Sequence, residues 1–213
     1  MKTDDLVAML AAGAEPVAQR ATARRYTAAL AWGGAGSLLL MVLALGLRAD
    51  LRAAALLPMF WMKLAFPLAL AAAALAAVSR LSRPGASLGF APYALAAPVL
   101  MVWAVAAWNL AAAEPGQRAA LILGGTWASC TAYVVLVSVP GFIAVMWAMR
   151  GLAPTRFALA GATAGLLAGA TGAAAYALHC DEMQAPFVAV WYVLGMLVPG
   201  MAGAIAGPRL LRW

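Results

Sequence analysis

The sequence predicts an all-α polytopic membrane protein, a bundle of six transmembrane helices with a short cytoplasmic N-terminal helix. Apolar residues occupy 66% of the 213 positions, whereas about half is usual in a soluble domain. Charged residues make up only 10%, against about 25% in soluble proteins, which is too few to cover a surface that faces water. The continuous runs of Ala, Leu and Val do not alternate with polar residues, which excludes transmembrane strands.

Six apolar segments of about 20 residues are long enough to cross the roughly 30 Å hydrocarbon layer as helices. The first follows a polar stretch and has full spanning length, so we interpret it as an uncleaved signal anchor. Residues 1–25 then form an N-terminal segment, and residues 26–213 form one transmembrane domain. The six spans are expected at residues 26–47, 56–78, 90–111, 130–149, 157–178 and 186–207.

Basic residues fall mainly on one side of the predicted spans, with ten on that side and three on the other. Because cytoplasmic loops retain Lys and Arg, we expect both termini in the cytoplasm. The ten are Lys2, Arg20, Arg24, Arg25, Arg80, Arg83, Arg150, Arg156, Arg209 and Arg212, and the three are Arg48, Arg52 and Arg118.

The N-terminal segment can form a helix with one apolar face. Thr3 can cap it, two acids favour its first turn, and Leu6, Met9 and Leu10 share one side. A helix of about ten residues is marginal alone in water. Its apolar side therefore either rests on the membrane or docks into a partner. The alternative is a plain juxtamembrane tail whose arginines serve only topology.

The fifth and sixth spans carry small residues at intervals of four. Packing of neighbouring helices is the expected role, and a substrate path is the alternative. The fifth has Gly161, Gly165, Gly169, Ala173 and Ala177, and the sixth has Gly195, Pro199, Gly203 and Gly207.

Lys63 is the one basic residue inside a predicted span, roughly 10 Å from its outer end. It either snorkels outward, pairs with a carbonyl or acid of the bundle, or has a functional role. The sequence contains no nucleophile-elbow, zinc-protease or P-loop motif, so we do not expect an enzyme.

The two cysteines are predicted to lie at the same end of neighbouring helices. Cys130 lies 20 residues before Arg150, and Cys180 lies 24 residues after Arg156. These distances, about 30 and 36 Å of helix, both reach the outer face. The short connection between the two arginines makes the fourth and fifth spans antiparallel neighbours.

Polar side chains flank Cys180, namely His179, Asp181 and Glu182. Two thiols at one end of a helix pair can form a disulfide, or they can share a soft metal ion with His179 completing the site. The alternative is a pair of ordinary buried cysteines.

The chain resembles the NrsF-like anti-sigma factors of proteobacteria over its whole length. The resemblance rests on the opening residues 1–6, the six spans, the cysteine before the fourth span, and His179-Cys180-x-Glu182 followed by Phe187 and Trp191-Tyr192. It implies a protein of the bacterial inner membrane that holds an extracytoplasmic-function sigma factor inactive through its cytoplasmic part. It also implies that Cys130 and Cys180 match the signal-responding cysteines of the family, which are linked to heavy-metal or oxidative stress.

We therefore expect a membrane anti-sigma factor that binds its sigma factor through Leu6, Met9 and Leu10. Cys130 and Cys180 would sense the signal, with His179, Asp181 and Glu182 in support. The expected partners are the sigma factor and the lipid bilayer, without direct nucleic-acid contact. No cofactor is required beyond a transient soft metal ion at the cysteine pair. The alternative function is a small transporter or metal-handling permease that uses Lys63 and the cysteine face.

Overall fold

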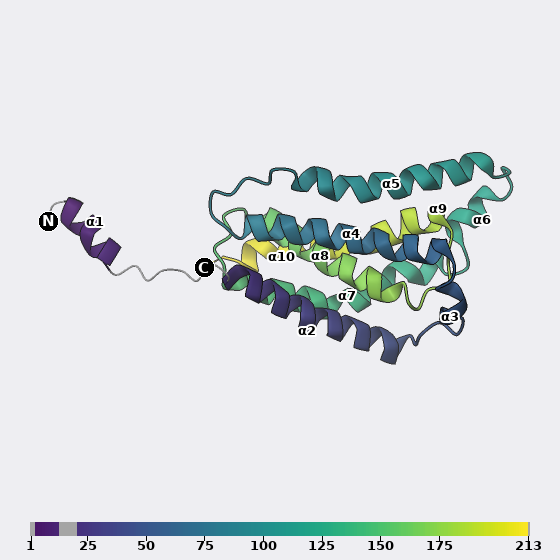
Figure 1. The fold of residues 1–213 in the computed structure, drawn as a ribbon, viewed down its shortest axis with the longest axis horizontal. Coiled ribbons are helices and arrows are strands. Elements are labelled where there is room, and N and C mark those ends of the chain that lie inside the picture. Colours follow the sequence, from purple (N-terminus) through teal and green to yellow (C-terminus); the bar gives the residue numbers. More distant parts are fainter. Residues whose placement is uncertain (1–2, 13–20, 213) are drawn as a thin grey trace.

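The computed structural model describes residues 3–12 and 21–212, and within these residues it contains helices and no strands (Figure 1). In chain order the elements are α1 (Thr3–Ala12), α2 (Ala21–Ala44), α3 (Leu51–Ala54), α4 (Pro58–Leu81), α5 (Ala91–Ala112), α6 (Arg118–Leu123), α7 (Trp127–Arg150), α8 (Phe157–Tyr176), α9 (Ala185–Phe187), the π-helix η1 (Val188–Tyr192) and α10 (Val193–Leu210).

Six helical stretches of the described residues are long and apolar enough to cross a membrane, which confirms the predicted fold class. The fourth stretch differs most from its predicted range, because it runs over Arg118–Arg150 rather than 130–149. It consists of α6 and α7, separated by a turn at residues 124–126. Gly124 has a φ of 57° and a ψ of −162° there, a combination that is essentially restricted to glycine and that ends α6. The helix of Cys130 therefore begins at Trp127.

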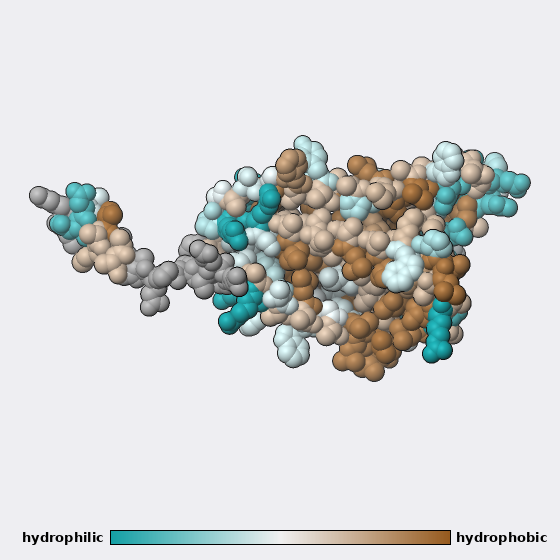
Figure 2. All heavy atoms as spheres, viewed as in Figure 1, coloured by the Kyte–Doolittle hydropathy of each residue, from teal (hydrophilic) through white to brown (hydrophobic). Residues whose placement is uncertain are grey.

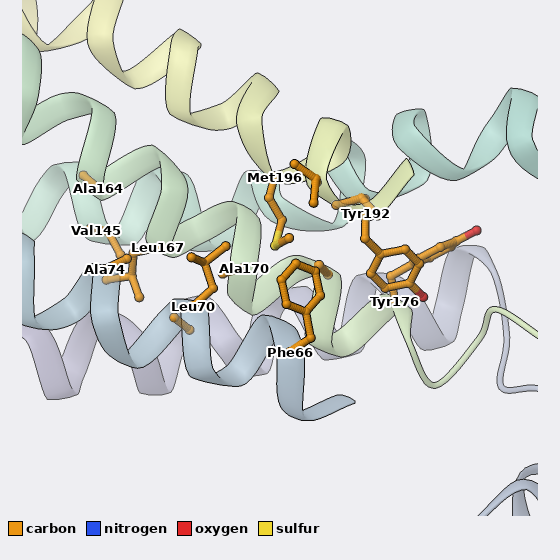
Figure 3. Packing of buried hydrophobic residues seen from close by; sticks show 14 of the residues in the cluster. Phe66, Leu70, Ala74, Val145, Ala164, Leu167, Ala170, Tyr176, Tyr192 and Met196 are labelled. Carbon is orange, nitrogen blue, oxygen red and sulfur yellow. The ribbon is translucent and has the colours of Figure 1, made fainter. Parts of the chain in front are cut away.

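Helix α8 lies at the centre of the bundle and packs against α2, α4, α7 and α10. It is the most buried of the six spans, whereas α5 is the least buried and lies along one side of the molecule (Figure 1). Figure 3 shows side chains from α4, α7, α8 and α10, among them Phe66, Leu70, Leu167 and Met196, meeting in this core. The centre of the bundle is thus apolar and closely packed.

The glycines of α8 and α10 allow these two helices to touch backbone to backbone. A Cβ atom at Gly161 would overlap the carbonyl oxygen of Gly203, and one at Gly165 would overlap that of Pro199. Small residues at such contacts are the usual packing material of membrane helices. The stripes predicted from the sequence therefore form a seam, which we call the α8–α10 seam.

Polar residues gather at both ends of the bundle, and the middle is apolar (Figure 2). The two ends carry different groups. We call one the cysteine end, because it holds Cys130, Cys180 and the loops that follow α2, α5 and α8. The other, the basic end, holds Arg24, Arg25, Arg80, Arg83, Arg150, Arg156, Arg209 and Arg212. Lys2 and Arg20, which the sequence also assigned to that side, lie outside the described residues.

Helix α1 stands away from the bundle in Figure 1. Its apolar residues Leu6, Val7 and Met9 are 40%, 59% and 62% exposed. The side chain of Leu10, which completes the predicted apolar face, lies outside the described part of the chain.

Candidate functional site

The structure brings the two cysteines together at the cysteine end. Cys130 lies in the first turns of α7, and Cys180 lies in the segment between α8 and α9. The thiols are free, with exposed fractions of 0% for Cys130 and 3% for Cys180. Interaction with the other thiol is the largest electrostatic influence on each of them. The pair is therefore a buried contact between two segments that are 50 residues apart in the sequence.

Two tyrosines enclose the cysteine pair on the core side. Tyr176 ends α8 and Tyr192 ends η1, and both side chains are almost completely buried. Their ring centroids are 5.8 Å apart, and Figure 3 shows them side by side at this end of the apolar core. The Tyr192 hydroxyl makes no hydrogen bond with the described residues. It lies near enough to Cys180 for the two groups to influence each other electrostatically.

The π-helix η1 determines how Tyr192 enters the site. A π-helical turn is wider than an α-helical turn and frees backbone carbonyls. Trp103 Nε1 of α5 donates to the carbonyl of Ala189 at 3.0 Å, and Thr131 Oγ1 of α7 donates to that of Trp191 at 3.4 Å. The wide turn is thus held by neighbouring helices on two sides.

Lys63 points into the bundle instead of snorkelling outward. Its side chain is 2% exposed, and its Nζ donates to the carbonyl oxygens of Cys180 at 2.6 Å and Glu182 at 2.7 Å. The same Nζ lies 5.5 Å from the centre of the Tyr192 ring. Of the three roles considered from the sequence, these contacts correspond to pairing with backbone carbonyls of the bundle.

A second cation fixes the same segment from the loop that follows α2. Arg48 Nη1 donates to the carbonyl of Cys180 at 3.2 Å. Its guanidinium also donates to both carboxylate oxygens of Asp50, at 2.6 and 2.8 Å. This pairing with Arg48 holds the pKa of Asp50 below its usual value. The carbonyl of Cys180 therefore accepts hydrogen bonds from two positively charged groups.

The residues predicted to support the cysteines are directed elsewhere. His179 Nδ1 lies 2.9 Å from the carbonyl oxygen of Gly46. The Glu182 carboxylate accepts a hydrogen bond from the backbone N–H of Gly125 at 2.6 Å, in the turn between α6 and α7. Asp181 is exposed and faces the charge of Arg48. His179 and Glu182 therefore anchor the Cys180 segment to neighbouring loops instead of facing the sulfurs.

The described residues do not bring His179 to the two sulfurs as the three-ligand metal site would need. Among residues 3–12 and 21–212, no group of three His, Cys, Asp or Glu side chains is arranged to hold a metal ion. The physical reason is the direction of His179, whose ring packs on Tyr133 and Tyr176 and bonds to Gly46. The polar surroundings of the two sulfurs are instead Lys63 and tyrosine hydroxyls.

The electrostatic surroundings of the two thiols differ. Cys180 lies outside the membrane-spanning helices. Its interaction with the Cys130 thiol and the positive charge of Lys63 lower the pKa of the Cys180 thiol below its usual value, although burial of the thiol acts in the opposite direction. A lower thiol pKa increases the fraction of thiolate, which is the nucleophilic form.

Sequence reasoning missed Tyr176 and Tyr192 as members of the site. Trp191-Tyr192 was part of the family resemblance, but apolar and aromatic residues are common throughout these spans. The local signal was a tyrosine hydroxyl near the end of the fifth predicted span and another near the start of the sixth, on either side of Cys180 in the sequence.

Three comparisons with known proteins bear on this arrangement. The family model described as NrsF, negative regulator of sigma F, matches residues 10–213. The chain is 53% identical to a protein of Azospira oryzae named probable anti-sigma-F factor NrsF, with both chains covered completely. It is 42% identical to the anti-sigma-F factor NrsF of Caulobacter vibrioides, again over the whole of both chains. No solved structure matches the chain.

Proposed function

The chain belongs to the NrsF family of negative regulators of sigma F, and we propose that it is a membrane anti-sigma factor. In this proposal it sequesters an extracytoplasmic-function sigma factor and releases it when the cysteine pair responds to a stress signal. It acts by binding and release rather than by catalysis. The juxtaposition of Cys130 and Cys180 at one buried contact is the observation that carries the signalling part of the proposal.

The proposal assigns the basic end to the cytoplasm and the cysteine end to the outer side of the bacterial inner membrane. The arginines gathered at the basic end support this orientation, because cytoplasmic loops retain basic residues. The outer side is an oxidising compartment, where thiol pairs can be converted to disulfides.

Helix α1 is the proposed sigma-binding element. Leu6 and Met9 are exposed on a helix that stands apart from the bundle. An amphipathic helix of this kind binds by laying its apolar side into a groove of its partner. Arginines at the basic end, among them Arg83 and Arg156, border a hollow of about 250 Å³ that can contribute a positive surface to the same complex.

Oxidation of the cysteine pair is the proposed signal. Formation of a disulfide removes the hydrogen from each thiol, joins the sulfurs, and transfers two electrons to an oxidant such as a hydroperoxide. A soft ion held by the two thiolates alone is the competing form of the signal. In either form the Cys180 segment and α7 would be tied more closely than they are by the present contact.

Such a change at the cysteine pair would reach the basic end through α7 and α8. The two helices touch closely at Gly172, where a Cβ atom would overlap the Ser138 hydroxyl. Closely packed helices move as rigid bodies, so a shift at one end is transmitted along the helix. The proposed result is a displacement of the connection at residues 151–156 and release of the sigma factor.

The test is a reporter driven by the sigma factor in cells that carry Cys130→Ser, Cys180→Ser or both. Each variant should repress as the wild type does but fail to respond to peroxide, because one thiol cannot form the bridge. Ser129→Ala, next to Cys130, is the matched control and should respond normally. A response to cadmium without a response to peroxide would favour the soft ion. Full induction of the double variant would contradict the signalling role.

Sigma-factor binding is tested separately by Leu6→Asp with Leu10→Asp. Burying two carboxylates against an apolar groove costs several kcal/mol, so repression should be lost and the reporter should become constitutive. Co-purification of the full-length protein with the sigma factor should fail in parallel. Normal repression by the double variant at wild-type abundance would mean that the binding surface lies elsewhere.

The contacts of Lys63 do not favour the alternative of a small permease. Its ammonium is bonded to two backbone carbonyls of the Cys180 segment, and small residues of α8 and α10 are used for direct helix contact. A permease would also tolerate loss of residues 1–25, whereas the proposed anti-sigma factor would not.

A further inference from the structure

Lys63 is a buried cation, 2% exposed, in the bundle. Among residues 3–12 and 21–212, no carboxylate lies within ion-pairing distance of its Nζ. Two of the three ammonium donors are used by the carbonyls of Cys180 and Glu182. Burying a charge is costly unless it is paired. The bundle therefore holds a positive charge at a position where an anion would be stabilised.

The group best placed to become that anion is the thiol of Cys180. Lys63 Nζ donates to the carbonyl of this same residue at 2.6 Å and to that of Glu182 at 2.7 Å, so its charge lies in the Cys180 segment. Arg48 approaches the carbonyl of Cys180 from the opposite loop. Both cations thus donate hydrogen bonds to Cys180 itself.

The other titratable groups around the pair do not neutralise Lys63. Tyr176 and Tyr192 present hydroxyls, which can donate hydrogen bonds to a thiolate. The carboxylate of Glu182 is bonded to Gly125, and Asp181 is exposed beside Arg48. His179 is directed at Gly46.

We propose that Lys63 makes Cys180 the nucleophilic thiol of the pair and leaves Cys130 as the resolving thiol. This inference rests on the proposed function, because it assigns an order to the reaction by which the pair would sense an oxidant. Lys63 is a positioning residue in this scheme, since it holds the Cys180 segment and supplies its charge.

The order of bond changes follows from the assignment. The Cys180 thiolate attacks an oxygen of a hydroperoxide, so that an S–O bond forms, the O–O bond breaks and an alkoxide or hydroxide leaves. The Cys130 sulfur then attacks the sulfur of the Cys180 sulfenic acid. An S–S bond forms, the S–O bond breaks, and hydroxide leaves with the Cys130 proton as water. The two thiols have together given two electrons to the peroxide.

The test measures which cysteine is alkylated first by iodoacetamide in the purified full-length protein. The reduced protein in detergent is sampled over time between pH 5.5 and 9, and each cysteine is quantified by mass spectrometry of its peptide. We expect Cys180 to react at least about tenfold faster than Cys130 at pH 7, because only a few per cent of an ordinary thiol is ionised there. Alkylation of Cys130 first, or of both cysteines with the same onset near pH 8.5, would overturn the inference.

Lys63→Met separates the charge of Lys63 from its packing. The onset of Cys180 alkylation should move to higher pH by at least one unit, whereas Lys63→Arg should keep the onset close to that of the wild type. Arg52→Gln, an exposed charge at the same end, is the control. A purely structural role would change the rates of both cysteines in Lys63→Met without moving the onset for Cys180. If neither Lys63 variant folds, the wild-type pH series decides.

The alkylation series and the reporter assay fail independently. If Cys180 reacts first but the cysteine variants are induced normally in cells, the assignment of the nucleophile stands and the sensing function falls. If induction requires both cysteines but Cys130 reacts first, the sensing function stands and the role of Lys63 falls.

Discussion

The two ends of the bundle differ in what they enclose and what they expose. At the cysteine end, Lys63 and Arg48 donate hydrogen bonds to the carbonyl of Cys180, beside a buried pair of thiols. The basic end is also tied across the fold, because Arg150 Nε donates to the carbonyl of Leu210 at 3.1 Å. Helix α1, however, stands apart there with exposed apolar residues. One end therefore encloses a reactive pair, and the other presents charge and an apolar helix to its surroundings.

This difference matches the proposed division of labour. A site that responds to a small chemical change needs its two thiols held in contact before the change occurs. A site that binds another protein needs apolar surface that the fold itself leaves uncovered. The α8–α10 seam and the contacts of α8 with α7 connect the two ends mechanically.

The largest expected effect concerns which side of the membrane each end of the bundle faces, because a fused enzyme is either active or inactive. Alkaline phosphatase fused after Trp213, one residue beyond Arg212 of the basic end, should be inactive because that enzyme needs an oxidising compartment to form its disulfides. A fusion after Gly116, in the exposed connection between α5 and α6, should be active and serves as the control. Activity of the Trp213 fusion would place both termini outside and would invalidate the assignment of the two ends.

The connection between the ends can be broken at the α8–α10 seam. Gly165→Leu should lower the melting temperature by several degrees or prevent folding, because the new side chain would have to displace the backbone of Pro199. Overpacking a well-packed core costs about 1–3 kcal/mol or more. Gly34→Leu is the matched control, since a Cβ atom at that position in α2 meets no atom within 4 Å. Equal melting temperatures for the two variants would contradict the seam.

The transmembrane spans and the end of the bundle that holds the cysteines could be predicted from the sequence. The direction of individual side chains at that end could not. Six apolar runs were sufficient to locate six spans, and counting residues placed Cys130 and Cys180 at one end. The direction of His179 toward Gly46 could not be deduced, because it depends on where the loop after α2 passes. The π-helix that ends at Tyr192 likewise accepts hydrogen bonds from Trp103 and Thr131, which belong to other helices, so local sequence does not reveal it.

The start of α7 shows the same limit on a smaller scale. The predicted fourth span covers residues 130–149 and leaves the helix over Arg118–Leu123 unassigned. The Gly124-Gly125 pair is a turn signal, but it does not show which segment holds the turn in place. That turn is stabilised by the Glu182 carboxylate, which comes from a segment 58 residues further along the chain. Local sequence cannot report such a partner.

Removing this carboxylate tests one attachment of the cysteine end. Glu182→Ala removes the acceptor of the Gly125 N–H. Because this bond is exposed and water can replace the acceptor, we expect the free energy of unfolding to fall by only about 0.5–1.5 kcal/mol. Glu182→Gln keeps a neutral acceptor and should recover part of this loss. Glu114→Ala, an exposed acid in the loop after α5, is the control. Thermal unfolding of the purified protein measures the stability of all three variants. If Glu182→Ala unfolds at the same temperature as the wild type, this hydrogen bond does not stabilise the cysteine end.

The smallest expected effect concerns the pair of Arg48 and Asp50, which is the most solvent-exposed attachment of the Cys180 segment. Asp50 is 58% exposed, and exposed ion pairs contribute little. Because Arg48 lowers the pKa of Asp50 in the folded protein, the contribution of the pair is fully present above the ordinary pKa of an aspartate, near 4. It is lost as the pH falls through the lowered value. Asp50→Asn should therefore lower the melting temperature slightly at pH 7, and the difference from the wild type should shrink as the pH falls through the lowered pKa of Asp50. A difference that persisted at low pH would mean that Asp50 acts through packing rather than through its charge on Arg48.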